Sequence, residues 1–334
     1  MEFKEFTAGP DDDGKKLVKI IRVILESKKQ QSSPYSIIRK RLVRVNDKKT
    51  DETQIIRTND KIKIASFLLE GTQENQPGMT DQDESTKTLE KITVFRNDHI
   101  LITNKPSGMN VQKANGTDKA LNQIVEEACT KKDNSLTFTP GPLNRIDRNT
   151  SGLVVFSQSM EGARWFSQVL QEHKVEKTYL GIILGKFGKL NIKTRLVNMI
   201  ETIETSGRES KFQTVGVYSE NTDGPMLKKA VTIITPLSYG RYGKKDITLC
   251  RFNIETGRKH QIRAQSSHAG YPLLFDTAYG AFAEKNRTFF LHAFRMTFPD
   301  NSLGVPESIE CQPDENFIQF VKQSFTNIDF GFII

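Results

Sequence analysis

The chain has 334 residues, 36% of them hydrophobic and 26% charged, which fits a soluble globular protein with room for two domains. No window approaches the roughly 18 consecutive apolar residues of a membrane span, and residues 1–6 lack the layout of a signal peptide. The three cysteines are widely spaced, which argues against a disulfide framework and a paired-cysteine zinc site and favours a cytoplasmic location. The net charge of +8 indicates an anionic partner, of which nucleic acid is the commonest.

Charge divides the N-terminal part of the chain into two segments. Residues 15–64 carry 15 lysines and arginines against 5 aspartates and glutamates, a local excess of ten positive charges. Residues 72–90 carry five acidic residues against one lysine and are rich in Gln, Asn, Pro, Gly, Ser and Thr. Such a composition is typical of a flexible linker. We therefore expect a basic module over residues 1–71, a linker over 72–90 and a larger domain over 91–334.

The basic module is expected to contain two helices and a small sheet. Apolar residues recur at helical spacing over residues 17–25, and a second helix is expected to begin near Pro34. Residues 43–45 and 60–64 alternate as strands do. This order of elements resembles the alpha-L RNA-binding module. The side chains expected to contact RNA lie on or just past the second helix: Arg39, Lys40, Arg41 and Arg44. A basic helix face binds phosphates with little sequence choice, although it is also typical of a solvated surface.

The larger domain is predicted to be of the α+β class. Apolar, β-branched runs predict strands at residues 92–95, 99–103, 178–185, 231–234 and 247–252. Helical spacing predicts helices at residues 121–128, 162–172 and 315–324. Because strands outnumber helices and the two do not alternate, we expect a mixed, mostly antiparallel sheet flanked by helices and loops.

The most informative run is residues 143–152, Leu-Asn-Arg-Ile-Asp-Arg-Asn-Thr-Ser-Gly. It places the carboxylate of Asp147 between two arginines on an expected turn before an apolar run. An aspartate in a turn ordinarily caps backbone amides. The run resembles, however, the His-Arg-Leu-Asp-x-x-Thr-Ser-Gly motif of the RluA/RluC/RluD family of RNA pseudouridine synthases, with Asn144 at the position of the histidine. The resemblance implies that Asp147 is the catalytic residue.

A second segment, residues 256–263, resembles the family's Thr-Gly-Arg-x-His-Gln-Ile-Arg string in full. The resemblance implies that Arg263 pairs with Asp147, because a nearby cation favours the ionised carboxylate. It also implies that Ile262 packs beneath the target base. Arg258 is as well explained by phosphate binding or a structural salt bridge as by catalysis.

Three further features match the same family. Tyr179 lies in a Lys-x-Tyr strand, and the resemblance implies that it stacks on the target uracil. An enzyme acting on a base must take it out of its stack, and the resemblance implies that Arg145 fills the vacated space, where a planar guanidinium suits stacking. The loop at residues 104–109, Asn-Lys-Pro-Ser-Gly-Met, is expected to be architectural.

Together these segments predict an RNA pseudouridine synthase that acts on large-subunit ribosomal RNA. The alternatives are a transfer-RNA pseudouridine synthase of the same family and a catalytically silent RNA-binding or ribosome-assembly factor. We expect neither a membrane association nor an obligate protein partner. No cofactor is expected, because the reaction is an isomerisation and the spacing of His260, His268 and His292 matches no zinc pattern.

Overall fold

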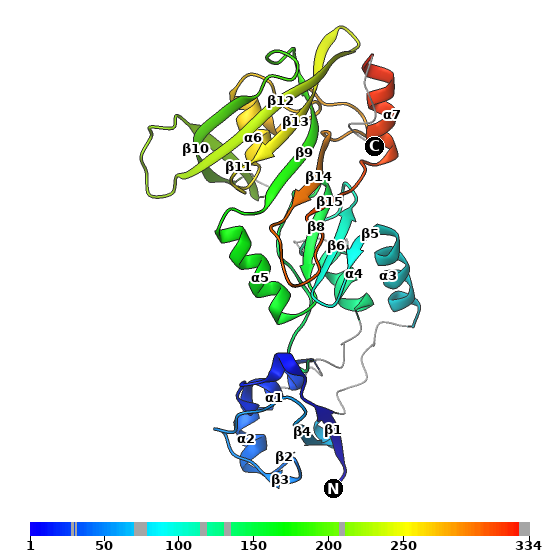
Figure 1. Cartoon of the computed structure of the whole chain (residues 1–334), viewed down its shortest axis with the longest axis vertical. Helices are drawn as coiled ribbons and strands as arrows, with labels where there is room; N and C mark the ends of the chain where they lie inside the picture. The colour runs from blue at the N-terminus through cyan, green and yellow to red at the C-terminus, as the bar shows by residue number, and fades with distance from the viewer. Residues whose placement is uncertain are drawn as a thin grey trace.

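The computed structural model of the chain describes residues 1–27, 30, 32–69, 79–113, 119–129, 135–206 and 211–326. Figure 1 shows a small N-terminal body at one end of an elongated molecule, and a larger body built around one long sheet.

The N-terminal body is a four-stranded antiparallel sheet, in the order β1-β4-β2-β3, packed against two helices. The strands are β1 (Phe3–Thr7), β2 (Val43–Val45), β3 (Lys48–Lys49) and β4 (Lys61–Ala65), and the helices are α1 (Leu17–Ser27) and α2 (Pro34–Arg39). Apolar residues of α1 and β4 form the core, in which Ile20, Ile21, Ile62 and Ile64 are fully buried. Both predicted helices and both predicted strands are present. The sequence does not indicate β1, because its two phenylalanines are three residues apart, whereas strands alternate with a period of two.

Part of the predicted linker is a helix, α3 (Met79–Ile92). Leu89 is buried against the apolar side of α4 (Leu121–Ala128), and Ser85 Oγ donates to Glu127 Oε2 at 2.7 Å. The acidic composition of this segment does not exclude a helix, because a helix that packs on one side needs few apolar residues and exposes its polar residues to solvent. The linker prediction is therefore wrong for residues 79–90, and its first part lies outside the described residues.

The larger body contains an eleven-stranded sheet, in which nine strands follow the order β11-β10-β12-β13-β9-β14-β8-β6-β5 while β15 pairs with β14 and β7 with β8. All of these pairings are antiparallel except that of β14 with β8. This arrangement confirms the predicted α+β class and mixed, mostly antiparallel sheet. The strands are β5 (Thr93–Arg96), β6 (Ile100–Lys105), β7 (Gly141–Pro142), β8 (Ser151–Ser157), β9 (Glu176–Leu184), β10 (Thr194–Ser206), β11 (Lys211–Tyr218), β12 (Lys228–Tyr242), β13 (Lys245–Ile254), β14 (Leu291–Thr297) and β15 (Ser308–Glu310).

Helices α4, α5 (Met160–Gln171) and α7 (Glu315–Ser324) lie where helical spacing predicts them, and each buries an apolar stripe. A further helix, α6 (Gln261–His268), carries the Gln-Ile-Arg segment. Apolar spacing does not predict α6, because its buried face is largely polar and includes Gln261, Arg263 and Gln265.

Strand β14 brings the distant motifs of the chain together. Its residue Ala293 pairs with Gly152 of β8 on one side and with Tyr179 of β9 on the other. Gly152 has a φ of +110°, and a Cβ there would lie 2.3 Å from the Ala293 carbonyl oxygen, so only glycine fits this crossing. The residues before β8 therefore lie beside the middle of β9.

The N-terminal body is hydrogen-bonded to the larger one through Asp12, whose exposed fraction is 0%. Its carboxylate accepts from Leu136 N and Thr137 Oγ1 at 2.7 Å, and from Ser135 Oγ at 3.1 Å. Lys15 Nζ also donates to Thr137 Oγ1 at 2.7 Å. Because a buried carboxylate needs such donors, these bonds fix where the N-terminal body attaches.

Candidate active site

Asp147 lies in the loop before β8, where Thr150 N donates to the Asp147 carbonyl at 3.1 Å and closes a turn. Its side chain is 24% exposed and faces a cleft of about 1110 Å³. The predicted turn is thus present, and it leaves the Asp147 carboxylate open to a ligand.

Asn144, which stands where the motif described above has a histidine, supports this loop. Its Oδ1 accepts from Val155 N of β8 at 2.7 Å, and its Nδ2 lies 3.5 Å from the Leu153 carbonyl oxygen. An amide offers both a donor and an acceptor, so it can satisfy two backbone groups at once. The substitution therefore leaves the loop anchored to β8.

Arg263 joins Asp147 to a second carboxylate. Its Nη1 donates to Asp147 Oδ2 at 3.1 Å, which confirms the predicted contact. Its Nε and Nη2 donate to Asp276 at 2.7 and 2.9 Å, a bidentate pair in which Asp276 is 2% exposed. Burial lowers the pKa of Arg263, but Asp276 and then Asp147 outweigh this and raise it. The guanidinium also lies between the rings of Phe289 and Tyr279, at 4.4 and 4.9 Å.

Sequence reasoning did not single out Asp276 as part of the site. The available signal was a lone carboxylate that ends the apolar run of residues 272–275, since charged residues in apolar surroundings need a partner. The partner, Arg263, is 13 residues away and becomes evident only in the fold.

His260 approaches Asp147 from the other side. Its Nε2 lies 3.8 Å from Asp147 Oδ1, and its Nδ1 is hydrogen-bonded to the Tyr279 hydroxyl at 2.9 Å. Burial lowers the pKa of His260, partly offset by Asp147, which favours a neutral imidazole near pH 7. The backbone of His260 has a φ of +50°, a conformation that is uncommon for non-glycine residues and often found at functional sites.

Tyr179 of β9 lines the same cleft, where it is almost fully buried. Burial raises the pKa of its phenol well above the ordinary value, and the nearby Asp147 raises it further. Lys177, two residues earlier, also lines the cleft, and burial lowers its pKa. The Lys-x-Tyr strand thus presents both side chains on one face of β9, as the period of two requires.

Lys105 supports the loop that contains Asp147. Its side chain is 0% exposed, and its Nζ donates to the carbonyl oxygens of Pro106, Met109 and Arg148 at 2.8–3.0 Å. Burial lowers the pKa of Lys105 to about 7, although Asp147 opposes this shift. The loop that the sequence identifies as architectural is therefore bonded directly to the residue after Asp147.

The cleft brings together five of the six predicted substrate-site residues. Asp147, Arg145, Tyr179, Arg258 and Arg263 all line it, and Ile262 lines a smaller adjoining hollow that shares Asp147 and Tyr179. Additional cations line the cleft, namely Lys113, Arg148, Lys177 and Lys259. A groove with this many cations suits a polyanion.

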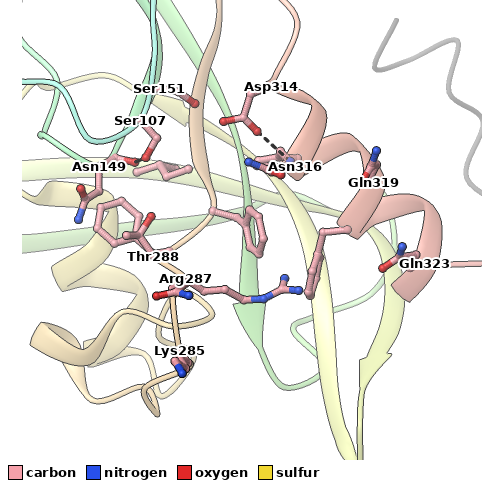
Figure 2. Close-up of a pocket in the computed structure, with 16 residues that line it drawn as sticks. Ser107, Asn149, Ser151, Lys285, Arg287, Thr288, Asp314, Asn316, Gln319 and Gln323 are labelled. Carbon is pink, nitrogen blue, oxygen red and sulfur yellow. Dashed lines mark hydrogen bonds between the residues drawn. The ribbon is translucent and has the colours of Figure 1, made fainter.

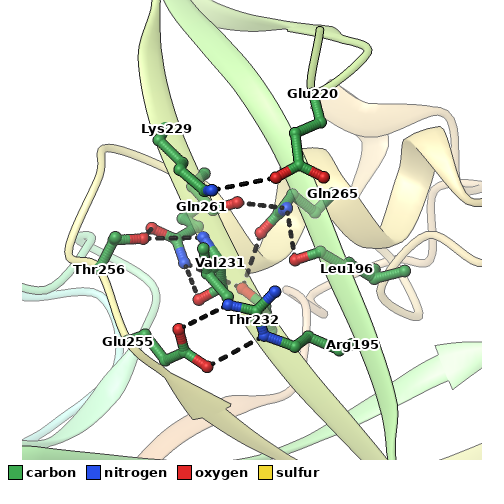
Figure 3. Close-up of polar contacts among 11 residues, drawn as sticks. Arg195, Leu196, Glu220, Lys229, Val231, Thr232, Glu255, Thr256, Gln261 and Gln265 are labelled. Carbon is green, nitrogen blue, oxygen red and sulfur yellow. Dashed lines mark hydrogen bonds and ion pairs between the residues drawn. The ribbon is translucent and has the colours of Figure 1, made fainter.

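A polar network fixes α6, and with it Arg258 and Arg263, against β10 and β12 (Figure 3). Gln265 Oε1 accepts from Thr232 Oγ1 at 2.7 Å, and its Nε2 donates to Asn198 Oδ1 at 2.8 Å. Gln261 Nε2 donates to the Val231 carbonyl at 3.0 Å, and its Oε1 accepts from Arg258 N at 3.1 Å. These bonds explain why the buried face of α6 is polar.

The four residues predicted to bind RNA in the N-terminal body are all exposed and lie outside the cleft. Arg39 Nε is paired with Glu52 Oε1 at 2.7 Å, and the guanidinium of Arg44 lies 4.8 Å from the ring centroid of Phe3. Lys40 and Arg41 follow the end of α2.

Among the described residues, no group of three His, Cys, Asp or Glu side chains is arranged to hold a metal ion. The described part of the chain also contains no helix long and apolar enough to cross a membrane.

A family model described as RNA pseudouridylate synthase matches residues 99–268. The chain is 27% identical to "Ribosomal large subunit pseudouridine synthase C" of Escherichia coli over 315 residues, covering 91% of both chains. It is 29% identical to "tRNA pseudouridine synthase C" of Haemophilus ducreyi over 202 residues, covering 60% of this chain and 78% of the relative.

Two solved structures share the fold. One is "Human RNA Pseudouridylate Synthase Domain Containing 4", with a TM-score of 0.56 and 16% identity over 73% of this chain and 96% of that one. The other is "Human RNA Pseudouridylate Synthase Domain Containing 1", with a TM-score of 0.53 and 22% identity over 67% of this chain and 83% of that one.

Proposed function

The chain belongs to the RNA pseudouridylate synthase family, and we propose that it isomerises uridines of large-subunit ribosomal RNA with Asp147 as the catalytic carboxylate. The observation that carries the role of Asp147 is its position: an accessible carboxylate held between Arg263 and His260 in a basic cleft.

The chemistry requires little beyond a well-placed carboxylate. Pseudouridine formation breaks the bond between N1 and C1′ of a uridine, turns the detached uracil and joins its C5 to C1′. One proton leaves C5 and one is gained at N1, so composition and oxidation state are unchanged. A carboxylate serves such a reaction as a nucleophile or as a base.

The surrounding residues have separate tasks in this proposal. Arg263 orients the Asp147 carboxylate through the hydrogen bond from its Nη1 to Asp147 Oδ2 at 3.1 Å. Tyr179, with its phenol kept neutral by burial, provides an aromatic surface for the uracil. Arg145 is exposed at the cleft mouth, where a guanidinium suits the space left by an extruded base.

Two observations favour ribosomal RNA over transfer RNA. The Escherichia coli ribosomal relative aligns over 91% of this chain, whereas the Haemophilus ducreyi tRNA relative aligns over 60%. The N-terminal body also adds an exposed basic surface to the catalytic cleft. Transfer RNA remains the second candidate, because "tRNA pseudouridine synthase C" of Vibrio parahaemolyticus is 31% identical over 197 residues, which cover 58% of this chain. We also propose a cytoplasmic location, because the relatives named for these substrates are bacterial proteins.

A silent RNA-binding factor is disfavoured by the state of the site. Asp147, Tyr179 and Arg263 are all present and adjacent to the cleft, and Asn144 anchors the loop to β8.

The decisive experiment maps pseudouridines in total RNA from cells with and without the gene, and in cells that carry Asp147→Asn. We expect at least one large-subunit ribosomal site to lose its modification in both altered strains. Loss of a transfer-RNA site alone would select the second candidate, and unchanged maps would contradict both.

A further inference from the structure

A second polar hollow lies beside the catalytic loop, between α7 and the segment at residues 285–291, with a volume of about 430 Å³. Figure 2 shows Ser107, Asn149 and Thr288 on one side of it, the α7 residues Asn316, Gln319 and Gln323 on the other, and Arg287 between them. Its size falls within the range of about 300–1,000 Å³ that is usual for small-molecule sites.

The hollow adjoins the catalytic cleft. Asn149 and Phe289 belong to the walls of both. Asn149 is two residues from Asp147, and its carbonyl oxygen accepts from Ser107 Oγ at 2.8 Å. The shared wall is therefore bonded to the loop at residues 104–109, whose Lys105 also bonds the Arg148 carbonyl oxygen. An RNA strand that extends from the cleft past Asn149 would reach the second hollow.

The cations of the hollow suit a phosphate. The guanidinium of Arg287 rests against Phe320 and Phe275, at 5.4 and 5.8 Å from the ring centroids, and has no carboxylate partner among the described residues. Lys285 is exposed beside it and is likewise unpaired within the described part of the chain. The lining also contains the carboxylate of Asp314, which caps α7 by accepting from Phe317 N at 2.9 Å, so two cations face one anion in the hollow. A guanidinium that rests against aromatic rings and is otherwise exposed keeps N–H groups available, which favours phosphate binding.

The amides of the hollow suit a base. Asn149, Asn316 and Gln323 form no side-chain hydrogen bond with other described residues, and Gln319 uses one N–H for Glu315 Oε1 at 3.1 Å. An amide offers both donors and acceptors, which matches the edges of unpaired nucleobases. Sequence-specific recognition of RNA commonly reads such splayed-out bases on their edges.

We propose that this hollow is a second nucleotide subsite, which binds a nucleotide flanking the target uridine in the same RNA strand. Arg287 and Lys285 contact its phosphate, and the amides of α7 contact its base. The proposal rests on the proposed function, because it places the flanking nucleotide of the strand whose uridine lies at Asp147. It assigns to α7 a part in choosing which uridine is modified.

The test compares four enzymes on an unmodified large-subunit ribosomal RNA transcript, or on a transfer-RNA transcript if that is the substrate in cells. They are the wild type, Lys285→Glu, the double variant Gln319→Ala with Gln323→Ala, and the control Lys189→Glu. Lys189 is exposed and lines neither the cleft nor the hollow. Pseudouridine formation gives KM and kcat, binding at several salt concentrations gives the salt slope, and thermal unfolding checks that each variant is folded.

We expect Lys285→Glu to raise KM about fivefold or more and to reduce the salt slope by about one unit. The double variant is expected to raise KM about fivefold without a change in slope, because it removes hydrogen bonds and no charge. Lys189→Glu should change KM less than about twofold.

Equal KM values in the hollow variants and the control would overturn the subsite, as would a fall in kcat with unchanged KM. A wild-type enzyme that forms no pseudouridine on either RNA would overturn the proposed function and the subsite with it.

Discussion

At the scale of single residues, the Asp147 carboxylate and its loop are positioned by three side chains from two segments of the chain. Arg263 bonds one of its oxygens, His260 lies 3.8 Å from the other, and Lys105 holds the carbonyl of the next residue. All of these contacts are made within the folded chain, and they fix the orientation of the Asp147 side chain. Such preorganisation is a main source of catalytic power in enzymes.

The first prediction concerns Asp147→Asn. The change keeps the size of the side chain but removes its charge and replaces one acceptor oxygen with an NH2 group, so the reaction should slow by at least about 10²–10⁴-fold. RNA affinity should stay within about twofold, because many cations of the cleft remain. Activity is measured as pseudouridine formed on the transcript, and affinity by filter binding. Product formation at a rate comparable to wild type would rule out the assignment of Asp147.

The second prediction concerns Asp276→Asn. Arg263 would keep its contact with the more exposed Asp147 but lose its buried partner, and an uncompensated buried charge costs about 3–5 kcal/mol. We expect a loss of this size in the free energy of unfolding, measured with urea, together with a lower kcat. Asp147→Asn is the matched control and should cost less stability, because its carboxylate is 24% exposed. Equal losses in the two variants would contradict a structural role for Asp276.

At the scale of elements, β14 connects the two halves of the site. Its His292 is fully buried, with Nδ1 bonded to Ser151 Oγ and Nε2 to the Cys311 carbonyl oxygen, both at 2.9 Å. The first bond attaches β14 to the start of β8, four residues after Asp147. His292 therefore supports the crossing of β14 and β8 and is not free to act as a ligand.

The third prediction is a loss of stability in acid that depends on His292. Burial lowers its pKa to about 4, although the Cys311 carbonyl and Asp314 oppose this. Between pH 6.5 and 4 the unfolded chain binds a proton that the folded chain does not, so stability falls as pH falls through this window. The loss should be about 3 kcal/mol between pH 7 and pH 4, since one pKa unit corresponds to about 1.36 kcal/mol.

Urea unfolding at several pH values, for wild type and His292→Gln, tests this prediction. The variant lacks the titrating group, so its stability should fall by about 3 kcal/mol less than that of wild type over the same window. Parallel pH profiles for the two proteins would show that His292 does not contribute.

Elements that pack through apolar stripes were predictable from the sequence, and those that pack through polar contacts were not. The apolar stripe of α1 and the alternation of apolar and polar residues in β4 predicted the N-terminal body. Helix α6 is anchored to β12 by Gln261 and Gln265, whose partners on that strand lie 30 and 35 residues away, so no apolar pattern marks the helix. Asp276 was not predicted as a site residue because its partner Arg263 is 13 residues away in the sequence. Asp147, Tyr179 and Arg263 were identified because their motifs are local strings.

At the scale of the whole molecule, hydrogen bonds of Asp11 and Asp12 connect the body with the basic N-terminal surface to the body with the basic cleft. Asp12 bonds residues 135–137, and Met160 N of α5 donates to Asp11 Oδ2 at 3.2 Å. The cleft and the N-terminal body can therefore act on one RNA at the same time. Linked binding surfaces increase affinity because the second contact becomes intramolecular.

The last prediction tests whether the N-terminal body supplies RNA affinity. Lys40 and Arg41 are exposed, follow α2 and lie outside the cleft. Neutralising both with Lys40→Gln and Arg41→Gln should lower the salt slope of binding to the unmodified transcript by about 1–2 units, because each phosphate contact contributes about 0.7–0.9. KM should rise while kcat stays unchanged, since Asp147 and its neighbours are untouched. The control changes Lys189 and Lys193 to Gln, which are equally exposed but outside the N-terminal body. If both pairs lower the slope equally, the N-terminal surface is only solvated and the net charge of +8 alone explains the affinity.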